Sequence, residues 1–172
     1  MSAGHFLILG GTGFLGPHIV RAALARGHRI TLFNRGKTNP HLFPELKKLR
    51  GDRRKGDLAA LEDPSLRFDA VIDTSGYVPR NVRKTARMLA DRGSQYIFVS
   101  SISAYKDGSV TGINERSELG SIEQKLAESI KDRQGIMENY GPLKAMCEAE
   151  AEAAFPGRCT VIRPGLIVGP GD

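Results

Sequence analysis

His5–Gly16 reads HFLILGGTGFLG, a short apolar run that stops at three glycines spaced by two residues, Gly10, Gly13 and Gly16. A strand that feeds a helix through a glycine-rich turn presents bare backbone N–H groups to a diphosphate. The first glycine permits the tight turn, the second lets the backbone approach the ligand, and the third lets the helix pack on its strand. Glycines also make ordinary strand-to-helix turns, but the place between an apolar run and a helical pattern favours nucleotide binding.

The composition limits the classes of protein to which this chain can belong. The chain has 172 residues, 40% of them hydrophobic, which suits one domain with a substantial core. No apolar stretch approaches the ~18 residues of a membrane span, and Phe6–Leu9 is too short for the core of a signal peptide. Cys147 and Cys159 lack metal-type spacing and the four histidines are scattered, so we expect no metal site and a reduced, cytoplasmic setting.

The charge is distributed unevenly along the chain. The net charge of +6 divides into 17 Lys and Arg against eight Asp and Glu over residues 1–100, and eight against 11 over residues 101–172. A basic half is compatible with RNA binding. No arginine-rich run is interleaved with aromatic residues, however, which favours cationic helices around an anionic cofactor over a nucleic-acid partner.

Apolar runs alternate with helical patterns over most of the chain. This alternation predicts a Rossmann-type, doubly wound α/β fold with a parallel sheet and helices on both faces. The expected strands are His5–Leu9, Arg29–Asn34, a short strand leading into Lys55–Asp57, Ala70–Asp73, Gln95–Ser100 and a strand within Cys159–Val168. The expected helices are Phe14–Arg26 ended by Gly27, Val78–Arg92 closed by Gly93, and Gly141–Phe155.

Residues 106–139 form a long polar excursion. They are dotted with glycine and lack a sustained apolar face, apart from a short helical pattern near Ile122–Ile130. Excursions of this kind inside a compact domain tend to be lids, binding loops or disordered segments. We therefore treat 1–172 as one dinucleotide-binding domain in which 106–139 is an insertion or lid.

The end of the second expected strand bears on the choice of cofactor. An acidic residue there commonly holds the ribose hydroxyls of adenosine, whereas here Asn34 is followed by Arg35 and Lys37. An adenosine 2′-phosphate would repel a carboxylate and bind a guanidinium, so these residues favour NADP over NAD. The alternative is that Arg35 and Lys37 are solvated turn residues. Asp57 is placed to accept a hydrogen bond from adenine, and Gly76 to let the backbone pass beside the ribose and diphosphate.

Tyr140 and Lys144 place a phenol and an ammonium four residues apart on one face of a helix start. A free tyrosine, with a pKa near 10, is a poor base, and a nearby ammonium favours its phenolate. Lys144 is also suited to hold a ribose hydroxyl. A serine from 100–103 would orient a substrate oxygen, and the residue types leave open which serine does so. The same spacing is also that of an ordinary surface pair.

Taken in this order, these pieces resemble the extended short-chain dehydrogenase/reductase family, the NAD(P)-dependent epimerases and dehydratases. The matching segments are GGTGFLG (10–16), GD (56–57), VIDTSG (71–76), FVSSISAY (98–105), YGPLK (140–144) and RPGLIVGPGD (163–172). The phrase TLFNRGKT (31–38) further resembles a branch that includes isoflavone-reductase-like proteins and chloroplast stem-loop RNA-binding proteins. Because the segments run almost the whole length, the resemblance is specific in combination.

The resemblance implies roles for particular residues. It places the catalytic residues at Ser101, Tyr140 and Lys144, with Ser103 the next choice for the serine, and the adenine-contacting acid at Asp57. Together with the residues argued above, the expected cofactor-binding set is Gly10, Gly13, Phe14, Leu15, Gly16, Asn34, Arg35, Lys37, Asp57, Leu58, Thr74, Ser75, Gly76, Ser100, Tyr140, Lys144 and Pro164. Two departures matter: the gap from Ser101 to Tyr140 is longer than usual, and the C-terminal substrate domain of the family is missing, so we expect a C-terminally truncated chain.

The expected function is that of an NAD(P)-dependent oxidoreductase, epimerase or dehydratase. It would act by hydride transfer on a hydroxyl or carbonyl carbon, for example of a nucleotide sugar, with Tyr140 as the acid/base. The alternative is a non-catalytic nucleotide-sensing or RNA-binding protein on the same fold. This fragment alone is expected to bind cofactor without activity, and its exposed apolar surface favours a homodimer or aggregation. The sequence does not identify the substrate.

Overall fold

The sheet of this protein has six parallel strands in the order β3-β2-β1-β4-β5-β6. The computed structural model describes residues 3–170, so Gly171 and Asp172, the end of the RPGLIVGPGD segment, lie outside the described residues. The strands are β1 His5–Leu9, β2 Arg29–Asn34, β3 Lys47–Arg50, β4 Phe68–Asp73, β5 Gly93–Val99 and β6 Cys159–Ile162. This order confirms the predicted Rossmann-type, doubly wound α/β fold.

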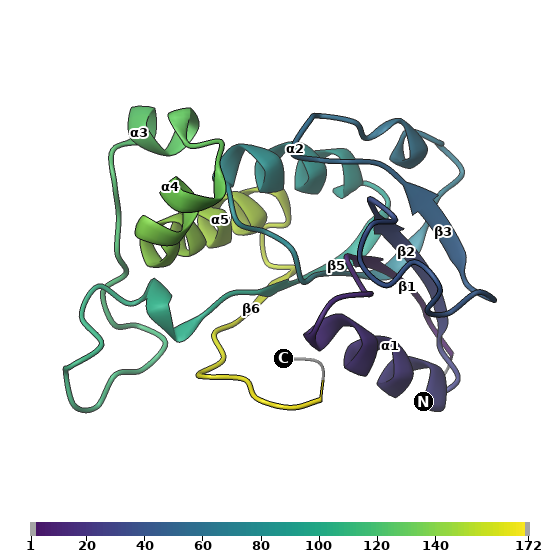
Figure 1. Cartoon of the computed structure of the whole chain (residues 1–172), viewed down its shortest axis with the longest axis horizontal. Coiled ribbons are helices and arrows are strands. Elements are labelled where there is room, and N and C mark those ends of the chain that lie inside the picture. The colour runs from purple at the N-terminus through teal and green to yellow at the C-terminus, as the bar shows by residue number, and fades with distance from the viewer. Residues whose placement is uncertain (1–2, 171–172) are drawn as a thin grey trace.

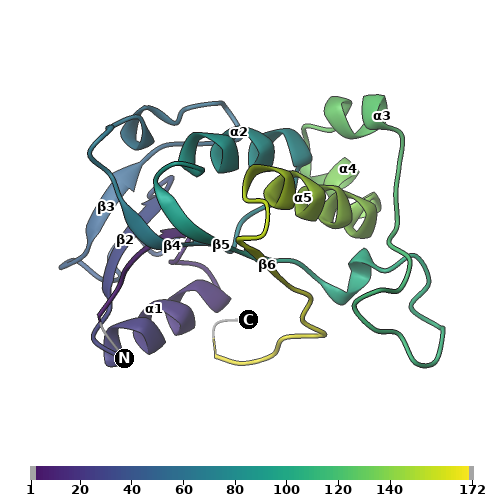
Figure 2. The ribbon, with the colours of Figure 1, turned by 180° about the vertical axis from the view of Figure 1, so that it is seen from behind.

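Helices cover both faces of the sheet, as Figures 1 and 2 show from opposite sides. The helices are α1 Leu15–Ala25, α2 Pro79–Leu89, α3 Gln124–Ser129, α4 Arg133–Glu138 and α5 Tyr140–Ala154, with short 3-10 turns η1 Ala59–Leu61 and η2 Ile102–Ala104. Helix α1 covers one face, while α2 and α5 pack side by side on the other. Among the described residues, none of these helices has the length and apolar character needed to cross a membrane.

Two apolar clusters bury the two faces. The alternating side chains of β1 divide between them, with Leu7 and Leu9 in the larger cluster and Ile8 in the smaller. Helices α2 and α5 contribute to the larger cluster, and Val20 of α1 to the smaller. Because β1 is central and covered on both sides, its residues are apolar in succession rather than alternately.

Two elements differ from the sequence expectation. The short strand expected to lead into Lys55–Asp57 lies earlier, at Lys47–Arg50. Its predicted place was wrong because this edge strand is only half-buried and shows no apolar run. Gly93, expected to close a helix, is instead the first residue of β5. A Cβ there would lie 2.9 Å from Val71, so the absence of a side chain serves close packing.

The excursion over 106–139 leaves the sheet after β5 and returns to α5 (Figure 1). It carries α3 within the expected helical stretch, and a second short helix, α4, that the sequence did not indicate. Arg80 of α2 donates to the carbonyl oxygens of Ala127, Glu128 and Ile130 at the end of α3, at 3.3, 2.9 and 2.7 Å. These carbonyl oxygens at a helix end would otherwise have no hydrogen-bond partner within their helix. Through these three hydrogen bonds, Arg80 holds the excursion against α2.

Candidate functional site

A cavity of about 400 Å³ opens at the carboxyl ends of the central strands. Four segments line it: the glycine turn 10–16, the end of β2 with the loop that follows it (33–38), the loop after β3 (51–54) and, after β4, Thr74, Ser75 and Tyr77. In open α/β sheets, ligands bind outside the carboxyl ends of the strands at the point where the strand order reverses. Here that point lies between β1 and β4, so the cavity occupies the expected place.

The glycine turn combines tight packing with an open surface. A Cβ at Gly10 would lie 2.5 Å from Thr74 Oγ1, and one at Gly16 would lie 2.7 Å from the backbone of Gly11. At Gly13 a Cβ would meet only the Thr38 methyl group, at 3.7 Å. Gly10 and Gly16 are therefore required for packing, whereas Gly13 leaves its backbone accessible. These features fit a diphosphate held by main-chain N–H groups.

The loop after β2 brings uncompensated positive charge to the cavity. Asn34 Nδ2 donates to the Gly10 carbonyl at 2.9 Å, and Asn34 Oδ1 accepts from the Gly36 N–H at 2.9 Å. This amide thus joins the glycine turn to the loop. Within residues 3–170, the exposed side chains of Arg35 and Lys37 have neither a hydrogen bond nor an ion pair. Both cations remain available to an anionic ligand.

The loop after β3 brings Asp52, rather than Asp57, to the cavity. Asp52 lies two residues after the end of β3 and lines the cavity, whereas Asp57 is exposed and Leu58 is buried in the core, and neither lines it. Two Gly-Asp pairs lie close together here, Gly51-Asp52 and Gly56-Asp57, and β3 ends directly before the first of them. Sequence reasoning selected the second pair because it placed the strand too late.

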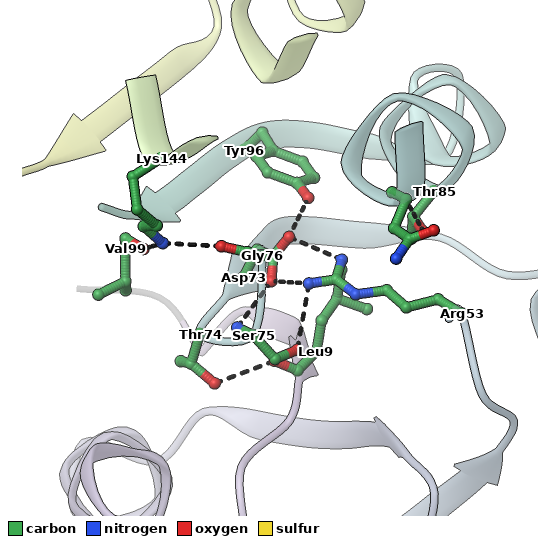
Figure 3. A network of polar contacts seen from close by, with 11 residues as sticks. Leu9, Arg53, Asp73, Thr74, Ser75, Gly76, Thr85, Tyr96, Val99 and Lys144 are labelled. Carbon is green, nitrogen blue, oxygen red and sulfur yellow. Dashed lines mark hydrogen bonds and ion pairs between the residues drawn. The ribbon is translucent and has the colours of Figure 1, made fainter. Parts of the chain in front are cut away.

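Lys144 of α5 is held beneath the loop after β4 (Figure 3). Its Nζ donates to the carbonyl oxygens of Gly76 at 2.8 Å and Val99 at 2.6 Å, and lies 4.3 Å from the centroid of the Phe98 ring. Burial lowers the pKa of Lys144 to about 8. An ammonium has three N–H donors, and the described chain occupies two of them. One donor remains for a ligand or a neighbouring side chain.

Tyr77 connects Lys144 to Tyr140, and sequence reasoning missed it. The rings of Tyr77 and Tyr140 lie 6.4 Å apart, and Lys144 Nζ lies 5.5 Å from the centroid of the Tyr77 ring. Tyr77 lines the cavity and is 46% exposed. Partial burial of Tyr77 and the neighbouring Tyr140 raise its pKa. Its position directly after Gly76, at the carboxyl end of β4, is the signal that could have identified it.

The serines after β5 have different environments. Ser100 is buried and its hydroxyl donates to Glu148, while half-buried Ser101 accepts from the Ser103 N–H at 3.1 Å. Gly141 packs against the Ser103 carbonyl so closely that a Cβ has no room. The segment with Ser101 and the start of α5 with Tyr140 are thereby brought into contact.

The cavity lining thus includes only part of the expected set. The expected residues that line it are Gly10, Gly13, Phe14, Leu15, Gly16, Asn34, Arg35, Lys37, Thr74 and Ser75. Those outside the lining, besides Asp57 and Leu58, are Gly76, Ser100, Tyr140, Lys144 and Pro164. Lys144 is nevertheless coupled to the cavity through Gly76 and Tyr77.

Glu148 fixes the segments on either side of the serine loop. Its carboxylate accepts from Arg163 Nη2 at 2.7 Å and from the Ser100 hydroxyl, and it is 2% exposed. Arg163 Nη1 also donates to the Tyr105 hydroxyl at 3.2 Å. One buried carboxylate on α5 therefore holds β5, β6 and the start of the excursion together.

Replacing Glu148 with glutamine is expected to lower the free energy of unfolding by about 2–3 kcal/mol, because Arg163 loses its charged acceptor in a largely buried place. Glu152→Gln, an exposed position one turn later on α5, is the matched control and should change stability by less than about 0.5 kcal/mol. Urea unfolding of the two variants measures the difference. Equal midpoints would contradict the structural role given to Glu148.

Known proteins resemble this chain over most of its length. Residues 6–172 match the NAD dependent epimerase/dehydratase family. A 2-alkyl-3-oxoalkanoate reductase from Stenotrophomonas maltophilia is 26% identical over 96% of this chain and 52% of its own length. The chloroplast stem-loop binding protein of 41 kDa b from Arabidopsis thaliana is 30% identical over 58% of this chain and 29% of its own length.

Among solved structures, the Bordetella bronchiseptica enzyme WbmG in complex with NAD and UDP has the same fold, with a TM-score of 0.71 at 17% identity over 94% of this chain. The match covers 53% of WbmG, so the chain spans about half the length of this structure and of the reductase. Such a structural likeness shows the fold, and the family match extends over nearly all residues. The chain belongs to the NAD dependent epimerase/dehydratase family.

Proposed function

We propose that the cavity binds a pyridine dinucleotide with its diphosphate over the glycine turn, and that the protein oxidises or reduces a hydroxyl or carbonyl carbon. The observation that carries the proposal is the meeting of two features at one edge of the sheet. The glycine turn lines the cavity, and the group formed by Tyr77, Tyr140 and Lys144 adjoins it. Reductase, epimerase and dehydratase chemistry share this arrangement.

Three side chains would divide the proton chemistry. Tyr140 would exchange the proton of the reacting hydroxyl. Lys144 would use its remaining N–H to hold a ribose hydroxyl and would favour the phenolate through its charge. Ser101 accepts a hydrogen bond from the Ser103 N–H, so its own O–H is free to donate to the substrate oxygen. The nicotinamide would supply the hydride acceptor or donor.

The substrate proposed is a nucleotide sugar. WbmG, which shares the fold, was solved with NAD and UDP, and the family is one of epimerases and dehydratases. The reductase relative is named for a 3-oxoalkanoate, so simple carbonyl compounds form the second arm of a substrate panel. Turnover of neither class would contradict the catalytic proposal.

For the cofactor we propose NADP over NAD. Arg35 and Lys37 also line a second cavity of about 410 Å³ next to the first. Its other charged side chains are Arg54, Lys55, Arg80 and Lys131, with Asp52 as the single acid. Six cations against one carboxylate, beside the expected adenosine end, would stabilise a 2′-phosphate dianion.

The double variant Arg35→Ala/Lys37→Ala is expected to weaken NADPH binding about 10- to 100-fold and to leave NADH binding nearly unchanged, because only the 2′-phosphate loses its charged partners. Fluorescence titration of each dinucleotide measures both affinities. Lys125→Ala, an exposed lysine on α3, is the control for a loss of charge. Equal weakening of NADPH and NADH would contradict the assignment of these residues to the 2′-phosphate.

The second candidate is a non-catalytic RNA-binding protein. The observation that favours it is the same cationic cavity, together with the stem-loop binding relative. Binding to RNA through many phosphates would weaken steeply with salt, whereas binding of a dinucleotide, which carries few phosphates, would weaken much less. Steeply salt-dependent RNA binding without dinucleotide binding would reverse the ranking.

A further inference from the structure

A buried carboxylate lies directly behind the cavity, at the end of β4. Asp73 Oδ2 accepts from Arg53 Nη1 at 2.8 Å and from the Tyr96 hydroxyl at 2.8 Å. Asp73 Oδ1 accepts from Arg53 Nη2 at 2.7 Å and from the Ser75 N–H at 2.9 Å (Figure 3). Both oxygens are thus fully used by two side chains and one backbone group, and Asp73 is completely inaccessible to solvent.

The contacts of Asp73 extend to three segments that line the cavity. Arg53 belongs to the loop after β3 and is itself part of the lining. Arg53 Nη2 also lies 3.2 Å from Ser75 Oγ, and the Ser75 hydroxyl donates to the carbonyl oxygen of Leu9 at 3.2 Å. Leu9 precedes the glycine turn, and Thr74 Oγ1 donates to the same carbonyl at 3.0 Å. One carboxylate therefore fixes the loops after β3 and β4 and the start of the turn.

Stability alone does not explain a charged pair at this place. Transfer of two charges to the interior is costly, and a well-packed apolar pair is often as stable. The three residues before Asp73 in β4 are apolar and buried, so the core accepts apolar side chains along this strand. Burial opposes ionisation of Asp73, but Arg53 and the hydrogen bonds outweigh it, and the pKa of Asp73 lies below its ordinary value.

We infer that Asp73 is a positioning residue for dinucleotide binding, which acts through Arg53 and Ser75 without touching the ligand. The inference rests on the proposed function, since it concerns the same cavity. The bidentate Arg53–Asp73 pair fixes the position of the loop after β3 relative to the glycine turn. It thereby sets the width of the part of the cavity that would hold adenosine. Tyr96, packed on Phe155 with ring centroids 5.0 Å apart, supports the carboxylate from the side away from the cavity.

The test measures dinucleotide affinity and thermal stability in parallel on the 172-residue chain. Asp73→Asn is expected to weaken NADH and NADPH binding about 10- to 100-fold, as for groups that orient ligating residues elsewhere. Tyr96→Phe, which removes one hydroxyl outside the cavity lining, is expected to weaken both about threefold or more. Thr85→Val is the control, because Thr85 is fully buried and its hydroxyl donates only to Asn81 within α2. It should leave both affinities unchanged.

A double variant separates positioning from a purely structural role. Asp73→Leu/Arg53→Met removes both charges and leaves neither ion buried alone, so its stability loss is expected to be limited to the two hydrogen bonds from the Tyr96 hydroxyl and the Ser75 N–H. Its affinity should remain as low as that of Asp73→Asn. Parent-like affinity in Asp73→Asn or in the double variant would overturn the positioning role while leaving the proposed function intact. Failure of the parent chain to bind either dinucleotide would overturn both.

Discussion

A Tyr140→Phe variant is expected to lose turnover by about 10²- to 10⁴-fold while it keeps its dinucleotide affinity. General acid–base catalysis contributes rate enhancements of this size, and the hydroxyl is the only group removed. The ring stays in place against Tyr77, so the packing at the start of α5 is retained. Steady-state rates with the substrate panel, combined with NADPH titration of the same variant, separate the chemical step from cofactor binding.

The outcome for Tyr140→Phe distinguishes two readings of the site. An unchanged rate would show that another group carries the proton, and Tyr77 would be examined next, because it is the phenol that lines the cavity. A loss of both rate and affinity would show that Tyr140 shapes the dinucleotide site instead of transferring a proton. Only the loss of rate alone supports acid–base chemistry.

Much of the fold was predictable because it depends on local patterns. The apolar run of β1, the glycines that follow it and the alternation of strands and helices are visible in the sequence and indicate a doubly wound parallel sheet, which the structure confirms. The edge strand β3 was misplaced because a half-exposed strand of the sequence KKLR carries little apolar signal. That error also led to the placement of Asp57, rather than the cavity-lining Asp52, at the end of this strand.

The candidate site was predictable only where residues lie close in the sequence. Tyr140 and Lys144 are one helical turn apart, and this spacing can be recognised in the sequence. Arg53 and Asp73 are 20 residues apart, and nothing in either neighbourhood indicates that they form a buried pair. Such pairing depends on which loops the parallel sheet brings to one edge, and this follows only from the folded structure.

The second large expected effect concerns Lys144. Because of this residue, stability and activity are expected to change in opposite directions as pH rises. Burial lowers the pKa of Lys144 from 10.5 to about 8, so between these values the unfolded chain binds more protons than the folded chain. The contribution of Lys144 to the free energy of unfolding therefore rises with pH across this window, by about 3 kcal/mol in total, and is lost as pH falls through 8. Turnover that needs the ammonium should fall above about pH 8.

Urea unfolding at pH 7, 8, 9 and 10 measures how the free energy of unfolding changes with pH. The Lys144→Met variant should lack the part of this change that comes from Lys144. Burial raises the pKa of Cys147 to about 12 and of Cys159 to about 11, above the value of 9.0 expected for the unfolded chain, so both thiols lower the stability as pH rises through the window. This opposing contribution is present in the parent chain and in Lys144→Met, so the difference between their slopes reports Lys144. The other groups that titrate in this window are shared by the two proteins and cancel in the difference between their slopes. Lys125→Met, an exposed lysine, should keep the slope of the parent chain. A parent chain with the same slope as Lys144→Met would mean that Lys144 keeps an ordinary pKa, which would contradict the burial of its ammonium beneath Gly76.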